Sequence, residues 1–207
     1  MHQLEGMLLE TLTNIKLFIF DLDGTIVKLP INWTEVKNKI RKILKANHSL
    51  TPLIPSIEEL VTDSELKKRI YETIDNEEMK VVKKLKSDKD IIKLFKKLKK
   101  LGYQLVLVTL QGFEPASEAL NRLNIREYFD LIISRDEKKN REEQIEVALK
   151  SMGVPPTQAI IVADKFRDIL VAEKLGCKSI AITGKLDISG DFKFTNVKHI
   201  LRMLEVS

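Results

Sequence analysis

The sequence contains a single cysteine, Cys177, among its 207 residues. One cysteine cannot form a disulfide within the chain, and it cannot build a cysteine-based metal cluster. No apolar run approaches the ~18 residues of a membrane-spanning helix, so we expect no membrane partner. The N-terminal stretch carries Glu5 and Glu10 and has no basic leader before an apolar block, which argues against a signal peptide. These absences favour the cytoplasm as the compartment.

The chain also lacks an arginine-rich run and has no basic stretch interleaved with aromatic residues. Its net charge of +5 comes mainly from lysines scattered along amphipathic segments, a pattern typical of solvated helix faces. We therefore do not expect nucleic acid as the partner, and the positive charge is free to attract a small anionic substrate. The apolar fraction of 43% is sufficient for a real core with a smaller unit attached.

Short and nearly continuous apolar runs recur along the chain, and this pattern is typical of strands buried on both faces. The runs lie at residues 15–20, 104–109, 130–134, 159–163 and 178–183. Between them are helical stretches with apolar residues three and four apart, three of which stop at a glycine. This alternation predicts an α/β fold, a three-layer α/β/α arrangement around a Rossmann-like parallel sheet.

Residues 30–88 interrupt the alternation, because they contain no convincing strand and have the spacing of several amphipathic helices. This stretch is too long for an ordinary connection between a strand and the next element. We therefore predict an inserted all-helical cap domain at 30–88, with a catalytic core formed by 1–29 together with 89–207.

Acidic residues follow two of the predicted strands. Asp21 and Asp23 come directly after the first strand, and Asp164 and Asp168 follow the fourth. Ligands of an open parallel sheet bind beyond the carboxyl ends of its strands, so these acids are expected to converge. Converging carboxylates repel one another unless protons or a hard cation offset their charge. Because all these ligands are oxygens, with no His or Cys nearby, the pattern points to Mg²⁺ rather than zinc.

Other residues near the same edge are suited to binding an anion. Thr109 ends the second strand, and Lys138 and Lys139 lie just beyond the third. Gly24 permits a tight turn that exposes backbone N–H groups beside the first acid. A cation next to a lysine and a threonine hydroxyl would form a good receptor for a dianionic phosphate.

Four segments in order resemble the motifs of the haloacid dehalogenase-like hydrolase superfamily. They are FIFDLDGT around Asp21, VTL around Thr109, KNREEQIEVAL from Lys139, and VADKFRDI carrying Asp164 and Asp168. The resemblance covers roughly residues 15–200, and the helical insert lies where that family carries its cap.

The resemblance implies a reaction. Asp21 would be the nucleophile that forms an aspartyl-phosphate, which water then hydrolyses. Asp23 would protonate the leaving oxygen and later deprotonate the water. An acid at this second position suits phosphate-ester cleavage, and family dehalogenases lack it. The implied activity is thus that of a Mg²⁺-dependent phosphatase, similar to phosphoglycolate phosphatase, acting on a small phosphorylated metabolite.

The resemblance also implies the binding groups. The side chains of Asp21 and Asp164 and the backbone carbonyl of Asp23 would hold Mg²⁺, with Asp168 acting mostly through a bound water. Thr109 and Lys139 would bind the phosphoryl oxygens. No residue is expected to bind an organic cofactor.

The sequence departs from the family pattern near the lysine. Asn140 follows Lys139 where proline is usual, so Lys138 is the alternative for that role. Two other functions stay open: a phosphomutase acting on a sugar phosphate, and a non-catalytic module that binds phosphate or Mg²⁺. The sequence leaves the natural substrate and the oligomeric state, monomer or dimer, undetermined.

Overall fold

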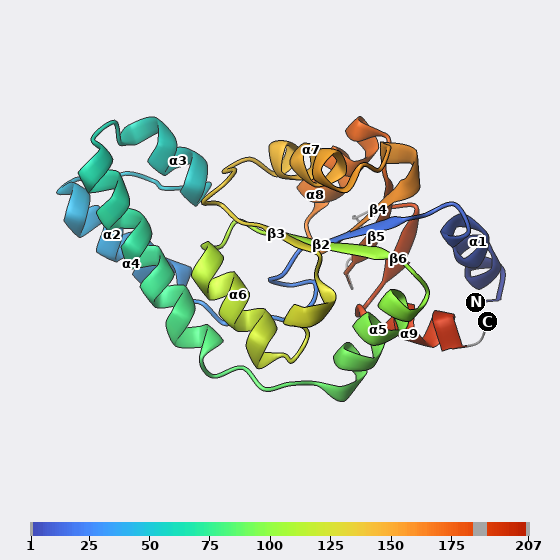
Figure 1. The fold of residues 1–207 in the computed structure, drawn as a ribbon. Helices are drawn as coiled ribbons and strands as arrows, with labels where there is room; N and C mark the ends of the chain where they lie inside the picture. The colour runs from blue at the N-terminus through green and yellow to red at the C-terminus, as the bar shows by residue number, and fades with distance from the viewer. Residues whose placement is uncertain (1, 184–189, 206–207) are drawn as a thin grey trace.

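The computed structural model describes residues 2–183 and 190–205. Within them, six parallel strands form one sheet in the order β3-β2-β1-β4-β5-β6 (Figure 1). The strands are β1 Leu17–Phe20, β2 Gln104–Val108, β3 Leu131–Ile133, β4 Ala159–Ala163, β5 Lys178–Ile182 and β6 Phe192–Phe194. The five predicted strands and the α/β class are confirmed. The sixth was not predicted, because a three-residue edge strand with a lysine at its centre is not a continuous apolar run.

Alternating side chains of β1 separate the core into two layers. Phe18 and Phe20 belong to one buried cluster, and Leu17 and Ile19 belong to the other. The first cluster is covered by α1 (His2–Leu12), α5 (Lys89–Lys100), α6 (Phe113–Arg122) and α9 (Lys198–Glu205). The second is covered by α7 (Arg141–Met152) and α8 (Phe166–Leu175), so helices lie on both faces of the sheet (Figure 1).

Two of the predicted glycine stops are left-handed caps. α7 ends at Gly153, with φ of 65°, and α8 ends at Gly176, with φ of 77°. A side chain would be strained in this conformation, whereas glycine adopts it freely. Each helix therefore ends at a defined residue, and the chain turns back from there toward the sheet.

The insert forms a separate group of helices beside the sheet (Figure 1). It contains α2 (Trp33–Leu44), α3 (Leu53–Leu60) and α4 (Ser64–Val82), as the spacing predicts. Their buried apolar residues make a cluster of their own, distinct from the two at the sheet. Pro55 lies in the first turn of α3, where the missing N–H would have had no helical partner. The boundaries at 1–29, 30–88 and 89–207 stay a prediction.

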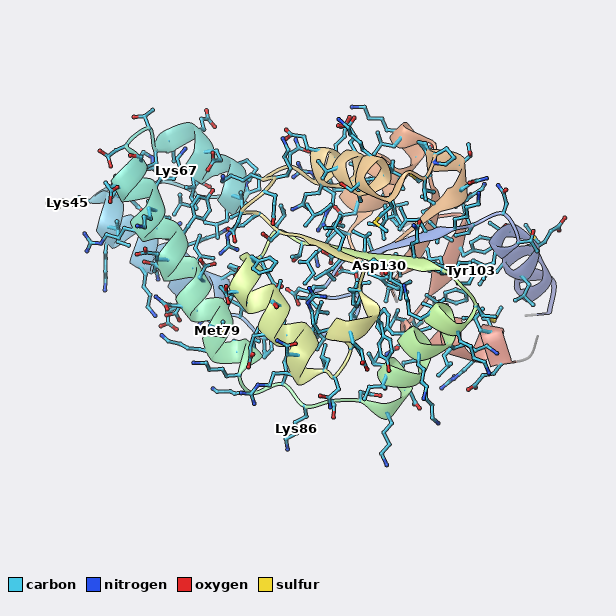
Figure 2. The ribbon with its side chains drawn as sticks, viewed as in Figure 1. Lys45, Lys67, Met79, Lys86, Tyr103 and Asp130 are labelled. Carbon is cyan, nitrogen blue, oxygen red and sulfur yellow. The ribbon has the colours of Figure 1, made fainter. Side chains whose placement is uncertain are left out.

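The exterior carries many of the lysines. Lys45 and Lys86, for example, lie at two edges of the molecule (Figure 2). Cys177, in contrast, is buried, and this burial raises the pKa of its thiol to about 11. No helix in the described ranges is long and apolar enough to cross a bilayer.

Candidate active site

The turn after β1 brings three of the predicted acids together. Asp21 is 6% exposed, and its N–H donates to the carbonyl of Val162 on β4 over 3.0 Å. In the same turn, Asp23 Oδ1 accepts from the N–H of Leu29 over 2.8 Å. Gly24 has φ of +88°, and a Cβ there would lie 2.2 Å from Asp164 Oδ2. Only glycine permits this close approach, which places the Asp164 carboxylate against the turn.

A buried arginine that we did not predict, Arg141, joins Asp21 to Asp168. Its Nη2 donates to Asp21 Oδ1 over 2.6 Å, and its Nε lies 3.2 Å from Asp168 Oδ1. Gln144, one turn later on α7, accepts from Arg141 Nη1 over 3.2 Å and donates to the backbone carbonyl of Thr109 over 2.7 Å. The guanidinium is thus fixed between two carboxylates at the strand ends.

The Lys139 side chain extends toward Tyr71 of the insert. Its Nζ lies 5.5 Å from the ring centre of Tyr71 on α4, so the amine faces the insert rather than the acids. The Nζ atom of Lys138, the alternative, lies 3.3 Å from Glu143 Oε2. The positions of both lysines follow from the residue at which α7 begins. The Asn140 side chain caps the start of this helix by accepting a hydrogen bond from the N–H of Glu142 over 2.9 Å. Both lysines therefore precede the helix, whereas Arg141 is its first residue.

Thr109 lies where the sequence predicts it, at the carboxyl end of β2. It is 2% exposed, and its N–H donates to the carbonyl of Ile133 over 3.0 Å. Its Oγ1 accepts from the N–H of Gln111 over 3.2 Å. The hydroxyl therefore has a fixed position in the same cavity as Asp21.

Burial raises the pKa of the two acids in the turn after β1, Asp21 and Asp23. Burial raises the pKa of Asp21 to about 7, the Arg141 charge opposes this rise, and Asp168 and Asp164 add to it. Burial also raises the pKa of Asp23, against the Leu29 N–H and the Lys165 ammonium. A raised pKa suits a group that must give up and regain a proton.

The acids retain capacity for a cation. Within the described residues, no three His, Cys, Asp or Glu side chains form a ready metal cluster. However, Asp164 Oδ1 and Asp168 Oδ2 are buried without a hydrogen-bond partner. Asp21 and Asp168 share one ion-pair partner, Arg141, and Asp164 is paired with Lys165, so the ion pairs supply fewer positive charges than there are carboxylates. A divalent ion that prefers oxygen ligands fits this set of donors.

A cavity of about 450 Å³ adjoins these groups. The core lines it with Asp21, Asp23, Thr109, Arg141 and Asp168, and the insert lines it from the other side. A ligand bound here would therefore contact both parts of the chain.

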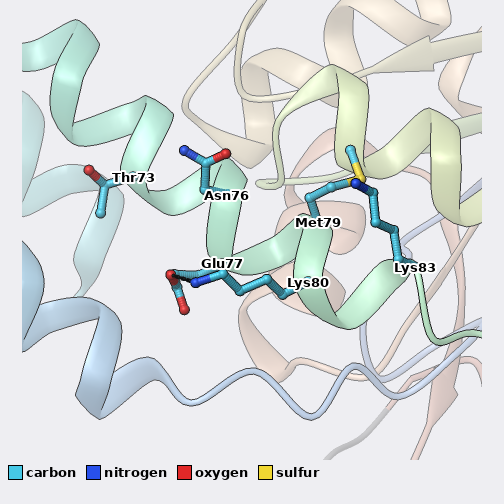
Figure 3. A pocket seen from close by; sticks show the side chains of 6 residues that line it. All are labelled: Thr73, Asn76, Glu77, Met79, Lys80 and Lys83. Atoms are coloured by element: carbon cyan, nitrogen blue, oxygen red, sulfur yellow. Dashed lines mark hydrogen bonds and ion pairs between the residues drawn. The ribbon is translucent and has the colours of Figure 1, made fainter.

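A second hollow lies along α4 and is formed by a different set of residues (Figure 3). They are Thr73, Asn76, Glu77, Met79, Lys80 and Lys83. Glu77 accepts from Lys80 over 2.5 Å and lies 2.9 Å from Lys39, so neighbouring lysines compensate its charge. This surface matches the expected solvated helix face.

Comparison with known proteins finds relatives of this chain. A model of the haloacid dehalogenase-like hydrolases matches residues 18–182. A pyrophosphatase PpaX from Bacillus velezensis is 28% identical over 60% of this chain, and a phosphoglycolate phosphatase from Neisseria gonorrhoeae is 34% identical over 42%. These alignments span only 48% and 38% of the relatives' own lengths.

A solved structure shows the same fold across nearly the whole chain. A haloacid dehalogenase-like hydrolase from Streptococcus pneumoniae superposes with a TM-score of 0.68 at 24% identity. The superposition covers 92% of this chain and 98% of that one. The family match over residues 18–182 identifies the chain as a member of the haloacid dehalogenase-like hydrolases.

Proposed function

We propose that this protein is a Mg²⁺-dependent phosphatase that hydrolyses a small phosphomonoester through an aspartyl-phosphate on Asp21. The observation that carries the proposal is the position of Asp21, buried at a strand end beside Arg141. Partnerless oxygens of Asp164 and Asp168 are its neighbours. The relatives named as a phosphoglycolate phosphatase and a pyrophosphatase support a phosphatase activity.

The reaction takes place in two displacements. An Asp21 oxygen attacks phosphorus, the bond from phosphorus to the leaving oxygen breaks, and Asp23 gives its proton to that oxygen. Water then attacks the phosphorus of the aspartyl-phosphate, Asp23 takes up the water's proton, and inorganic phosphate and the Asp21 carboxylate are released. The raised pKa of Asp23 supports this role, because the acid must be protonated in the first step.

Arg141 takes the place that the family resemblance gave to Lys139. A guanidinium donates parallel hydrogen bonds to two oxygens, and the Arg141 group is already held beside the nucleophile. The Thr109 hydroxyl supplies a further phosphoryl contact. Both groups would stabilise the charge that develops on the equatorial oxygens.

The side chains of Asp21 and Asp164 and the backbone carbonyl of Asp23 would hold Mg²⁺, with Asp168 orienting a bound water. When bound, the ion supplies positive charge that offsets the acids and the phosphoryl oxygens. The unpaired oxygens of Asp164 and Asp168 support this assignment.

The insert, residues 30–88, supplies one wall of the cavity, and this supports its role as a cap over the site. In the described ranges, Glu78 is the insert's one acid in that wall, and both its oxygens already accept donors. A phosphomutase needs a free acid–base group from the cap, so this pairing favours hydrolysis over transfer. We place the protein in the cytoplasm, in keeping with its cysteine usage.

The test is Asp21→Asn assayed with p-nitrophenyl phosphate and Mg²⁺. We expect turnover to fall by at least ~10³-fold, because the amide cannot form the covalent intermediate. Asp90→Asn, an exposed acid on α5, is the matched control and should retain full turnover. Residual activity within tenfold of wild type, in folded Asp21→Asn, would remove Asp21 as nucleophile. Phosphate binding by a wild-type protein that hydrolyses no ester would instead favour the non-catalytic module.

A further inference from the structure

The two walls of the cavity have opposite chemistry. The core wall carries the acids, Arg141 and the Thr109 hydroxyl described above. The insert wall is formed mainly by apolar residues from the start of α2 and the start of α3. They are Trp33, Pro52, Leu53, Ile54 and Pro55. The phosphoryl group belongs at the charged wall, so the remainder of a substrate must lie against the apolar one.

The insert wall offers few polar groups to a ligand. Glu78 is 0% exposed, and Arg135 Nη1 lies 2.8 Å and 3.1 Å from its two oxygens. Pro52 and Pro55 have no N–H to donate. On the core side, Lys165 is paired with Asp164, and the exposed Arg167 is a second basic residue that lines the cavity. A second anionic group, or a ring of hydroxyls, would therefore lose its hydration at the insert wall without equivalent partners.

Gln111 brings a buried donor without a partner to the cavity. Gln111 is 4% exposed and lines the cavity, and its Nε2 makes no hydrogen bond within the described residues. A buried amide donor of this kind calls for an acceptor, which a ligand can supply. The cavity therefore suits a body that is mostly apolar and carries few acceptors.

We infer that the leaving group of the substrate is a compact, mostly apolar alcohol that packs against Trp33 and the first turn of α3. The inference rests on the proposed phosphatase function and gives it a substrate class. It departs from the expected likeness to phosphoglycolate phosphatase, since the insert wall, unlike Arg167 on the core side, offers the glycolate carboxylate no charged partner. Phenyl phosphate is a simple ester of the favoured class, and a hexose phosphate represents the polyhydroxylated alternative.

Trp33 makes binding at this wall measurable, because it is the chain's sole tryptophan. Asp21→Asn with Mg²⁺ prevents turnover, and its tryptophan emission is followed during titration. The ligands are phenyl phosphate, phosphoglycolate, glucose phosphate and inorganic phosphate. We expect phenyl phosphate to shift the emission and to bind at least ~10-fold more tightly than the other three. Inorganic phosphate should leave the emission unchanged, because it reaches only the charged wall.

Leu53→Asn, made in the same background, keeps the size of the side chain but makes the wall polar. It should weaken phenyl phosphate binding by ~5–10-fold and leave inorganic phosphate binding unchanged. The matched control is Leu60→Asn on the same helix, whose side chain is 42% exposed and does not line the cavity. This control should change neither affinity.

Three results would overturn the inference: no binding of phenyl phosphate, equal binding of glucose phosphate or phosphoglycolate, or equal weakening of all ligands by Leu53→Asn. Hydrolysis by the wild-type protein is measured separately on the same three esters. Selective binding of phenyl phosphate without hydrolysis of any ester would overturn the proposed phosphatase and retain the apolar wall as a binding surface.

Discussion

Two buried arginines, Arg141 and Arg135, bind carboxylates in different surroundings. Arg141 is 6% exposed and joins Asp21 to Asp168 at the strand ends. Arg135 is 0% exposed and joins the loop after β3 to Glu78 on α4 of the insert. Both pairs are taken out of water, where an unmatched charge is costly. They differ in whether the carboxylate oxygens around them lack a hydrogen-bond partner.

At the strand ends, buried carboxylate oxygens of Asp164 and Asp168 lack a partner. At the insert, both oxygens of Glu78 accept, one from Arg135 alone and the other also from the N–H of Gly112 over 3.2 Å. Carboxylate oxygens without a partner can bind a group that arrives with the ligand, whereas fully paired oxygens are typical of a structural contact. We therefore expect Arg141 to govern turnover and Arg135 to govern stability.

The largest expected effect concerns turnover. Arg141→Ala should lower kcat/KM for p-nitrophenyl phosphate by ~10²–10³-fold, because it removes a fixed donor from the developing phosphoryl charge. Lys139→Ala is the matched variant, and it should stay within ~3-fold of wild type, since its amine lies over Tyr71. The opposite ranking would return the phosphate-binding role to Lys139.

The ion pair of Glu78 with Arg135 should affect the stability of the fold instead. Glu78→Ala leaves the Arg135 charge buried with one partner fewer, so the free energy of unfolding should fall by ~3–5 kcal/mol. Urea unfolding at about pH 8, where Glu78 is ionised, measures this loss. Replacing both residues, with Glu78→Leu and Arg135→Met, should recover most of it. Unchanged stability with lost turnover would contradict a structural role.

A smaller effect should appear in the pH dependence of stability. Burial raises the pKa of Glu78 from 4.5 to about 7, against the pull of Arg135. Between these values the unfolded chain has released a proton that the folded protein retains, so the free energy of unfolding should fall as pH rises. The fall should reach at most ~3 kcal/mol and level off above the folded pKa.

Glu78→Gln removes the titrating group and should flatten this part of the profile. Urea unfolding between about pH 5 and about pH 8 compares the two proteins. Identical slopes for wild type and Glu78→Gln would show that the pKa of Glu78 is not raised on folding.

The same contrast explains what the sequence could predict. The strand-end acids follow apolar runs, so their convergence depends only on parallel strands sharing one edge. The insert was predicted from its length and helical spacing. In contrast, the pairing of Glu78 with Arg135 joins residues 57 positions apart, and no local pattern indicates it.

Arg141 was missed although a local signal exists. Asn140 is a good N-cap residue, and a helix that starts there has Arg141 as its first residue and Gln144 one turn later. The family resemblance directed attention to Lys139, two residues earlier. The position of a basic side chain here depends on where the helix begins, and boundaries are the least predictable part of an element.

We expect turnover to depend on a divalent cation held by the strand-end acids. The most direct measurement is the rate of p-nitrophenyl phosphate hydrolysis by wild-type protein stripped with EDTA and then titrated with Mg²⁺. Stripping should reduce hydrolysis to the background rate, and adding Mg²⁺ back should restore it with saturation. Undiminished hydrolysis in excess EDTA would contradict this expectation.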